Sequence, residues 1–70
     1  MLKIDEKVTC RNMVGEIESF SHGHTAVFAP DNDPILGCVE LDDEELVEQD
    51  GQVYTAGQIV QDFQRRTGQV

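Results

Sequence analysis

Short runs of alternating apolar and polar residues, separated by turn-forming residues, constrain the fold of this chain more than any other feature. A period of two places successive side chains on opposite faces of a strand, so each run predicts a half-buried β-strand. Asn12-Met13 and the tetrad Ser21-His22-Gly23-His24 supply the bends between them. Together they predict a three-stranded antiparallel meander over residues 7–11, 14–20 and 25–28. Ile17 and Phe20 fall out of step in the second run, which predicts a β-bulge or a strong local twist.

The second half of the chain carries a fourth apolar run and a hairpin signal. Residues 35–41 are apolar on both faces, which predicts a strand that is central in the sheet or curved about Gly37. The acids at 42–45 suit one helical turn, because they favour the positive end of a helix dipole. Asp50-Gly51 lies between the β-prone runs 45–49 and 52–55 and predicts a tight hairpin.

The C-terminal segment carries helix signals. Thr55 and Gln58 have the spacing of a capping box, and Gly68 stands where a left-handed residue would end the helix. Arg65 and Arg66 fall in the last turn, where cations complement the dipole. An apolar strip on this helix packs on its own sheet or docks onto a second copy, so a homodimer is one expectation; the strip consists of Ile59, Val60 and Phe63.

A chain of 70 residues forms one domain and buries only about 60% of the surface that its unfolded form exposes. So small a core needs its bulky side chains, and we expect Phe28 and Phe63 to be buried. The chain opens Met1-Leu2-Lys3-Ile4 with no signal-peptide core, and no run approaches the roughly 20 apolar residues of a membrane helix. We expect a cytoplasmic protein with reduced thiols.

Charge narrows the class of partner. No lysine or arginine lies between Arg11 and Arg65, whereas twelve of the fourteen acids do, and the net charge is −9. Phosphate backbones are held by cations that displace condensed counterions, so such a surface repels nucleic acid and anionic membranes. It attracts a basic protein surface instead, and the sequence therefore predicts a protein partner.

Residues 5–28 resemble the opening of KOW-type, SH3-like small β-barrel domains, with Val8, Gly15, Ile17 and Val27 in the places of that pattern. The resemblance implies a small α+β fold: an SH3-like antiparallel barrel or meander of about five strands over residues 4–49. A hairpin and a C-terminal helix over residues 46–68 are appended to it. Members of this class bind RNA, ribosomal components or other proteins. The chain departs from the nucleic-acid binders because it lacks their basic loops.

Candidate chemical sites are few. His22 and His24 with Cys10 and Cys38 are the ligand types of a zinc site, but no pair has the Cys-x-x-Cys spacing, and buried thiols beside a polar turn are the commoner arrangement. A Cys10–Cys38 disulfide would close a long loop, but reduced thiols are favoured in the cytoplasm. No motif marks a catalytic residue, a cofactor site or a calcium loop.

The sequence thus favours a small acidic interaction module that is not an enzyme, needs no cofactor and binds a basic surface on a protein partner. One alternative is a nucleic-acid mimic that inhibits a DNA-binding protein, as mobile elements encode. A second is an SH3-like enzyme assembled across an oligomer. The expected partner-binding residues are Asp31, Asp33, Asp42, Asp43, Glu44, Glu45 and Glu48.

Overall fold

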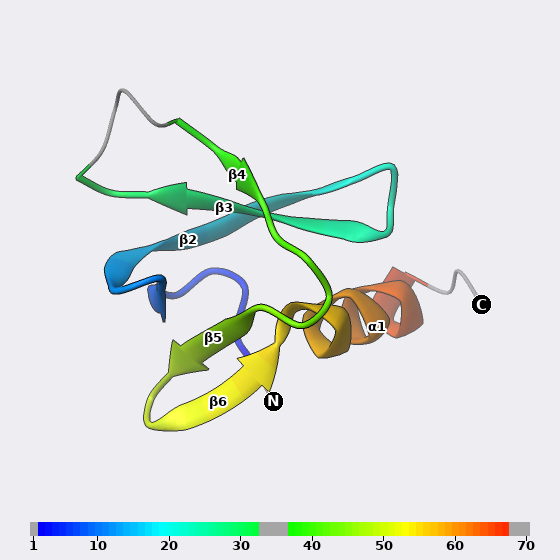
Figure 1. Ribbon diagram of the computed structural model, residues 1–70. Coiled ribbons are helices and arrows are strands. Elements are labelled where there is room, and N and C mark those ends of the chain that lie inside the picture. The colour runs from blue at the N-terminus through cyan, green and yellow to red at the C-terminus, as the bar shows by residue number, and fades with distance from the viewer. Residues whose placement is uncertain (1, 33–36, 68–70) are drawn as a thin grey trace.

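A computed structural model describes residues 2–32 and 37–67 of the chain, and it contains one antiparallel sheet and one helix (Figure 1). The sheet has the strand order β4-β3-β2-β1-β5-β6. The first four strands of the chain form a meander, and the hairpin of the last two strands extends the sheet beyond the first strand. The elements are β1 (Val8–Cys10), β2 (Met13–Ser21), β3 (Thr25–Pro30), β4 (Val39–Glu40), β5 (Leu46–Gln49), β6 (Gln52–Thr55) and α1 (Ala56–Thr67).

The expected small α+β fold with a C-terminal helix is confirmed, but the sheet does not close into a barrel. β4 and β6 are its two ends and do not pair with each other, so the SH3-like expectation holds only in part. The sheet has six strands rather than about five. In Figure 1 the strands β2, β3 and β4 form one part of the sheet and the hairpin β5–β6 forms the other. The helix α1 packs against β3 and β6.

Local turn chemistry sets the register of the strands. The expected bulge is confirmed, because the pairing of β2 with β3 shifts between Ile17 and Ser19. The Asp50-Gly51 hairpin is also confirmed, and both residues adopt the positive φ angles, 53° and 79°, that a tight two-residue turn requires. The first bend lies at Arg11-Asn12 rather than Asn12-Met13, because Cys10 pairs directly with Met13.

The expected strand over residues 35–41 is much shorter in the described structure. Residues 33–36 lie outside the described part, and β4 covers only Val39 and Glu40, at the edge of the sheet rather than its centre. Gly37 has a φ of 67°, which is incompatible with a regular strand at that position. The expected helical turn at 42–45 is a hydrogen-bonded turn instead, in which the Glu45 amide donates to the Asp42 carbonyl at 3.0 Å.

The helix completes the core. Ile59 and Val60 are 2% and 6% exposed and pack with Phe28 and Val47, which are fully buried. Phe63 is half-buried and stacks on Phe20, with 4.0 Å between the ring centroids. The first of the two expectations for this strip, packing on the chain's own sheet, therefore describes Ile59 and Val60, and a homodimer contact through Ile59, Val60 and Phe63 stays a prediction. The hairpin and helix share one core with the meander rather than forming an appendage.

The N-terminal segment is tied to the hairpin by Gln49, the buried polar residue of the core. Its amide oxygen accepts from the Lys3 amide at 2.7 Å and its amide nitrogen donates to the Lys3 carbonyl at 2.7 Å. These bonds satisfy a polar side chain that is only 5% exposed, and they let Leu2 enter the core. Within residues 2–32 and 37–67, no helix is both long and apolar enough to span a bilayer.

Candidate interaction surface

We call residues 40–45 the acidic loop. This segment runs from the last residue of β4 to the residue before β5, and it passes the start of α1 (Figure 1). Leu41 anchors this loop, because its side chain is 2% exposed and its amide donates to the Ala26 carbonyl at 2.9 Å. With Leu41 directed inward, Glu40, Asp42, Asp43 and Glu44 are exposed around it. They line a shallow hollow beside Thr25, the first residue of β3.

The acidic loop also caps the helix. The first amides of an α-helix have no partner within the helix. Here the Ala56 amide donates to the Glu45 carbonyl at 2.8 Å, and the Gly57 amide donates to the Asp43 carbonyl at 3.0 Å. Gly57 allows this approach. A Cβ at position 57 would lie only 3.3 Å from the Asp43 carbonyl oxygen and 3.3 Å from the Asp43 Cβ, which is a tight contact.

The expected capping box supplies the remaining acceptors. The Gln58 amide donates to the Thr55 hydroxyl at 3.2 Å, and the Thr55 amide donates to the Gln58 side-chain oxygen at 3.0 Å. No acid occupies the first turn of α1, so the carboxylates of the acidic loop are the negative charges near its positive dipole end. The backbone of the acidic loop is thus fixed at three points, on β3, on its own turn and on α1.

Four of the five acids of this loop form no salt bridge in the described structure, because Arg11 binds only the fifth, Glu45, and the chain's other four cations are engaged elsewhere. Lys7 pairs with Glu16 at 2.9 Å and with Asp31 at 2.8 Å. Lys3 pairs with Glu6 and Arg65 with Asp62, whereas Arg66 donates to the Leu2 carbonyl. Within the described part of the chain, no salt bridge reaches the side chains of Glu40, Asp42, Asp43 and Glu44.

Two of the expected partner-binding acids have partners within the chain. Arg11 donates to one oxygen of Glu45 through Nε at 3.1 Å and Nη2 at 2.9 Å, and this pairing raises the pKa of Arg11. Asp31 follows the far end of β3 and binds Lys7, whose pKa is raised by its hydrogen bonds to Asp31 and Glu16. Asp31 and Glu45 are thus poorer candidates for an external cation.

The other expected acids divide by position. Asp42, Asp43 and Glu44 are brought together in the acidic loop, Glu48 is exposed on β5, and Asp33 lies outside the described residues. The sequence reasoning missed Glu40. Its position next to the buried Leu41 was the available signal, because alternation directs it outward beside the acidic run.

The candidate zinc ligands do not form a site. His22 and His24 stack in the turn between β2 and β3, with 5.9 Å between ring centroids, and Cys10 is buried in the core. Cys38 was expected to be buried but is exposed beside the edge strand, where its thiol donates to Glu18 and the pKa of that thiol is raised. Both cysteines are free thiols, and the described residues contain no cluster of His, Cys, Asp or Glu suited to a metal.

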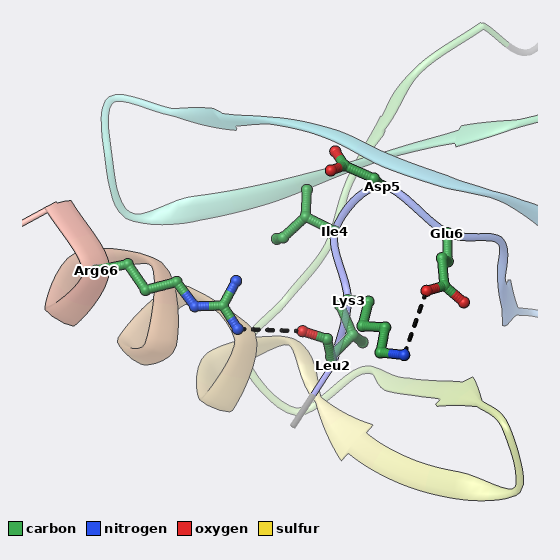
Figure 2. A pocket seen from close by; sticks show the side chains of 6 residues that line it. All are labelled: Leu2, Lys3, Ile4, Asp5, Glu6 and Arg66. Atoms are coloured by element: carbon green, nitrogen blue, oxygen red, sulfur yellow. Dashed lines mark hydrogen bonds and ion pairs between the residues drawn. The ribbon is translucent and has the colours of Figure 1, made fainter.

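A second hollow, of about 460 Å³, lies where the N-terminal segment meets the end of α1 (Figure 2). Figure 2 shows the Arg66 guanidinium extending from the helix to the Leu2 carbonyl, at 3.3 Å, and Lys3 reaching Glu6 at 3.5 Å. Both cations lining this hollow are therefore engaged. The contacts hold the N-terminal segment against the helix.

Comparisons with protein-family models, with curated proteins and with solved structures each found no match to this chain. The assignment of a function therefore rests on the geometry and charge of the residues described above.

Proposed function

We propose that the protein is a small interaction module whose acidic loop binds a basic surface on a protein partner. The observation that carries this proposal is the combination of a fixed backbone with four exposed carboxylates that form no salt bridge in the described part of the chain, those of Glu40, Asp42, Asp43 and Glu44. Folding places four carboxylates together at a cost in self-repulsion. A cation-bearing partner would relieve that repulsion.

The fixed backbone favours binding because little conformational freedom is left to lose. Charge complementarity of this kind mainly speeds the encounter of the two proteins and selects partners of positive charge. The attraction weakens as salt is added. The partner class is thus a protein surface rich in lysine or arginine. Nucleic acid would be repelled by the same charges.

The test compares two charge reversals that change the net charge equally. The loop variant carries Asp42→Lys and Glu44→Lys, at side chains that form no salt bridge in the described structure. Asp43 is avoided because its Cβ lies against Gly57. The control variant carries Asp5→Lys and Glu6→Lys, two exposed residues of the N-terminal segment, of which only Glu6 forms an exposed ion pair.

The probe is an acetylated, amidated peptide of alternating lysine and serine, titrated by fluorescence anisotropy at low and physiological salt. We expect the loop variant to bind at least about tenfold more weakly than wild type, and the control variant to lose less than about threefold. Equal losses in the two variants would show that net charge alone governs binding and would refute a site at the acidic loop.

A further inference from the structure

The outward face of the sheet carries an apolar patch that the core does not use. Val14, Leu46 and Val53 are 49%, 59% and 59% exposed, and they are the large hydrophobic residues that stand out as exposed in the described structure. Single exposed apolar residues are common on protein surfaces and need no explanation. These three, however, lie on one face of one sheet.

Strand register places them together. Val14 pairs with Thr9, Thr9 with Glu48, and Glu48 with Val53, so one row crosses β2, β1, β5 and β6. Because neighbouring strands lie about 4.8 Å apart, this row spans roughly 14 Å. Leu46 lies two residues from Glu48 on β5 and therefore faces the same way. We call Val14, Thr9, Leu46, Glu48 and Val53 the outer sheet patch.

Glu48 gives the outer sheet patch a charge preference. It lies at the middle of the row, is exposed, and forms no salt bridge in the described part of the chain. The cations at either end of β1, Lys7 and Arg11, are engaged by Glu16, Asp31 and Glu45. An occupant of the patch must therefore bring its own cation to Glu48.

The patch also adjoins the acidic loop. Leu46 follows Glu45 directly, and a shallow hollow over the patch is lined by Leu46, Glu48 and Val53 together with Thr9, Arg11, Asn12 and Val47. An apolar centre beside a charged rim is the usual anatomy of a protein interface. The two surfaces are therefore contiguous, and one partner spans both.

A second copy of this chain fits the patch poorly. A twofold contact centred on the patch would bring Glu48 of one copy towards Glu48 of the other, and both copies carry a net charge of −9. The residues of the patch match a different occupant, one that presents apolar side chains and a cation on the same face.

We propose that the outer sheet patch docks an amphipathic segment of the partner, with apolar side chains on Val14, Leu46 and Val53 and a lysine or arginine on Glu48. This inference rests on the proposed function, because it names the kind of basic partner that the acidic loop attracts. It adds an apolar selectivity that the acidic loop cannot supply.

The test uses two peptides of equal length and charge, a lysine–valine peptide with the repeat Lys-Lys-Val-Val and a lysine–serine peptide with the repeat Lys-Lys-Ser-Ser, because this repeat puts both residue types on each face of an extended segment. The patch variant carries Val14→Thr, Leu46→Thr and Val53→Thr, since threonine keeps a high strand propensity. We expect wild type to prefer the lysine–valine peptide by about tenfold or more, and the patch variant to retain a preference of less than about threefold. An unchanged preference would overturn the proposal.

The loop variant separates the two proposals. It should bind both peptides more weakly while keeping the wild-type preference for valine, so failure of the acidic loop and failure of the patch have different signatures. If the patch variant does not fold by circular dichroism, Leu46→Thr and Val53→Thr singly should each reduce the preference by about threefold. Dimerisation of wild type but not of the patch variant, measured by sedimentation in 0.5 M salt, would assign the patch to a second copy and overturn the proposal.

Discussion

At position 15 a side chain of any size would collide with the neighbouring strand. Gly15 pairs with Pro30, and a Cβ at position 15 would lie 2.8 Å from the Pro30 Cα and closer still to the Ala29 carbonyl oxygen. Both are backbone atoms, so no side-chain rotation relieves the contact. The absence of a side chain at position 15 thus allows a close approach of β2 and β3 ahead of the bulge.

Gly15→Ala should therefore destabilise the protein by about 3 kcal/mol, because the two strands must separate to admit the methyl group. Urea denaturation at 25 °C measures this change, with Ser19→Ala as a control on the exposed side of the same strand, expected within about 0.5 kcal/mol of wild type. Equal stabilities for the two variants would contradict the packing of β2 on β3.

Cys38 provides a second prediction at the scale of a residue. Its thiol donates a hydrogen bond to the Glu18 carboxylate, which raises the pKa of Cys38 and disfavours the reactive thiolate. Glu18→Gln removes the charge, so the rate of reaction with a disulfide reagent at pH 7.5 should rise several-fold and its pH profile should move to lower pH.

Cys10 should not react with that reagent until the protein unfolds, because it is 1% exposed and burial raises the pKa of its thiol. Cys38→Ser is the control and should abolish the fast phase. A fast phase that persists in Cys38→Ser would show that Cys10 is accessible, contrary to its place in the core.

Among the elements, the helix start joins local and distant parts of the chain. The side chains of Thr55 and Gln58 each accept a hydrogen bond from the other residue's amide. The two amides between them, of residues 56 and 57, donate to the carbonyls of Glu45 and Asp43. The capping box could be read from the sequence because its residues are three apart. The contacts of Asp43 and Glu45 could not, since they depend on how a loop crosses the sheet.

Thr55→Ala should cost about 1 kcal/mol in the free energy of unfolding, because the Gln58 amide loses its acceptor. Thr55→Ser retains the hydroxyl and should stay within a few tenths of a kcal/mol of wild type. Thermal or urea unfolding of the three proteins makes the comparison. If serine and alanine proved equally destabilising, the methyl group rather than the cap would be the stabilising feature.

For the whole molecule, local signals predicted the strands and turns better than the connections between distant segments. The bulge near Ile17, the Asp50-Gly51 turn and the helix start each have a signature within a few residues. The pairing of Thr9 with Glu48 and the ion pair of Arg11 with Glu45 do not, because they join segments more than thirty residues apart. This pairing makes the hairpin part of the main sheet.

The candidate site was predictable to a similar extent. Composition located the acidic run, but only the fold shows which acids are neutralised: Glu45 and Asp31 are paired, whereas Asp42 and Glu44 are not. The outer sheet patch had no sequence signature, since Val14, Leu46 and Val53 come from three separate strands and meet only through strand register.

Salt should stabilise this molecule. With a net charge of −9, self-repulsion outweighs the exposed ion pairs, each worth about 0–1 kcal/mol. Raising sodium chloride from 10 to 150 mM shortens the Debye length to about 8 Å. It should raise Tm by several degrees, the shift that a gain of about 1 kcal/mol in the free energy of unfolding gives in a domain of this size. Scanning calorimetry measures the shift.

The neutral variant carrying Asp42→Asn and Glu44→Gln is the control for this salt effect. It should melt at a higher temperature than wild type at 10 mM salt and gain less from added salt, because two unneutralised acids are gone. A Tm that falls as salt is added would mean that attractive pairs dominate the electrostatics of folding.

The central claim, that the acidic loop is a binding surface for basic proteins, is tested most directly by affinity capture from the source cell with quantitative mass spectrometry. Wild type, the loop variant and the charge-matched control variant serve as baits. The account predicts a set of basic proteins that wild type and the control variant retain and the loop variant loses. Identical capture by all three baits would contradict it.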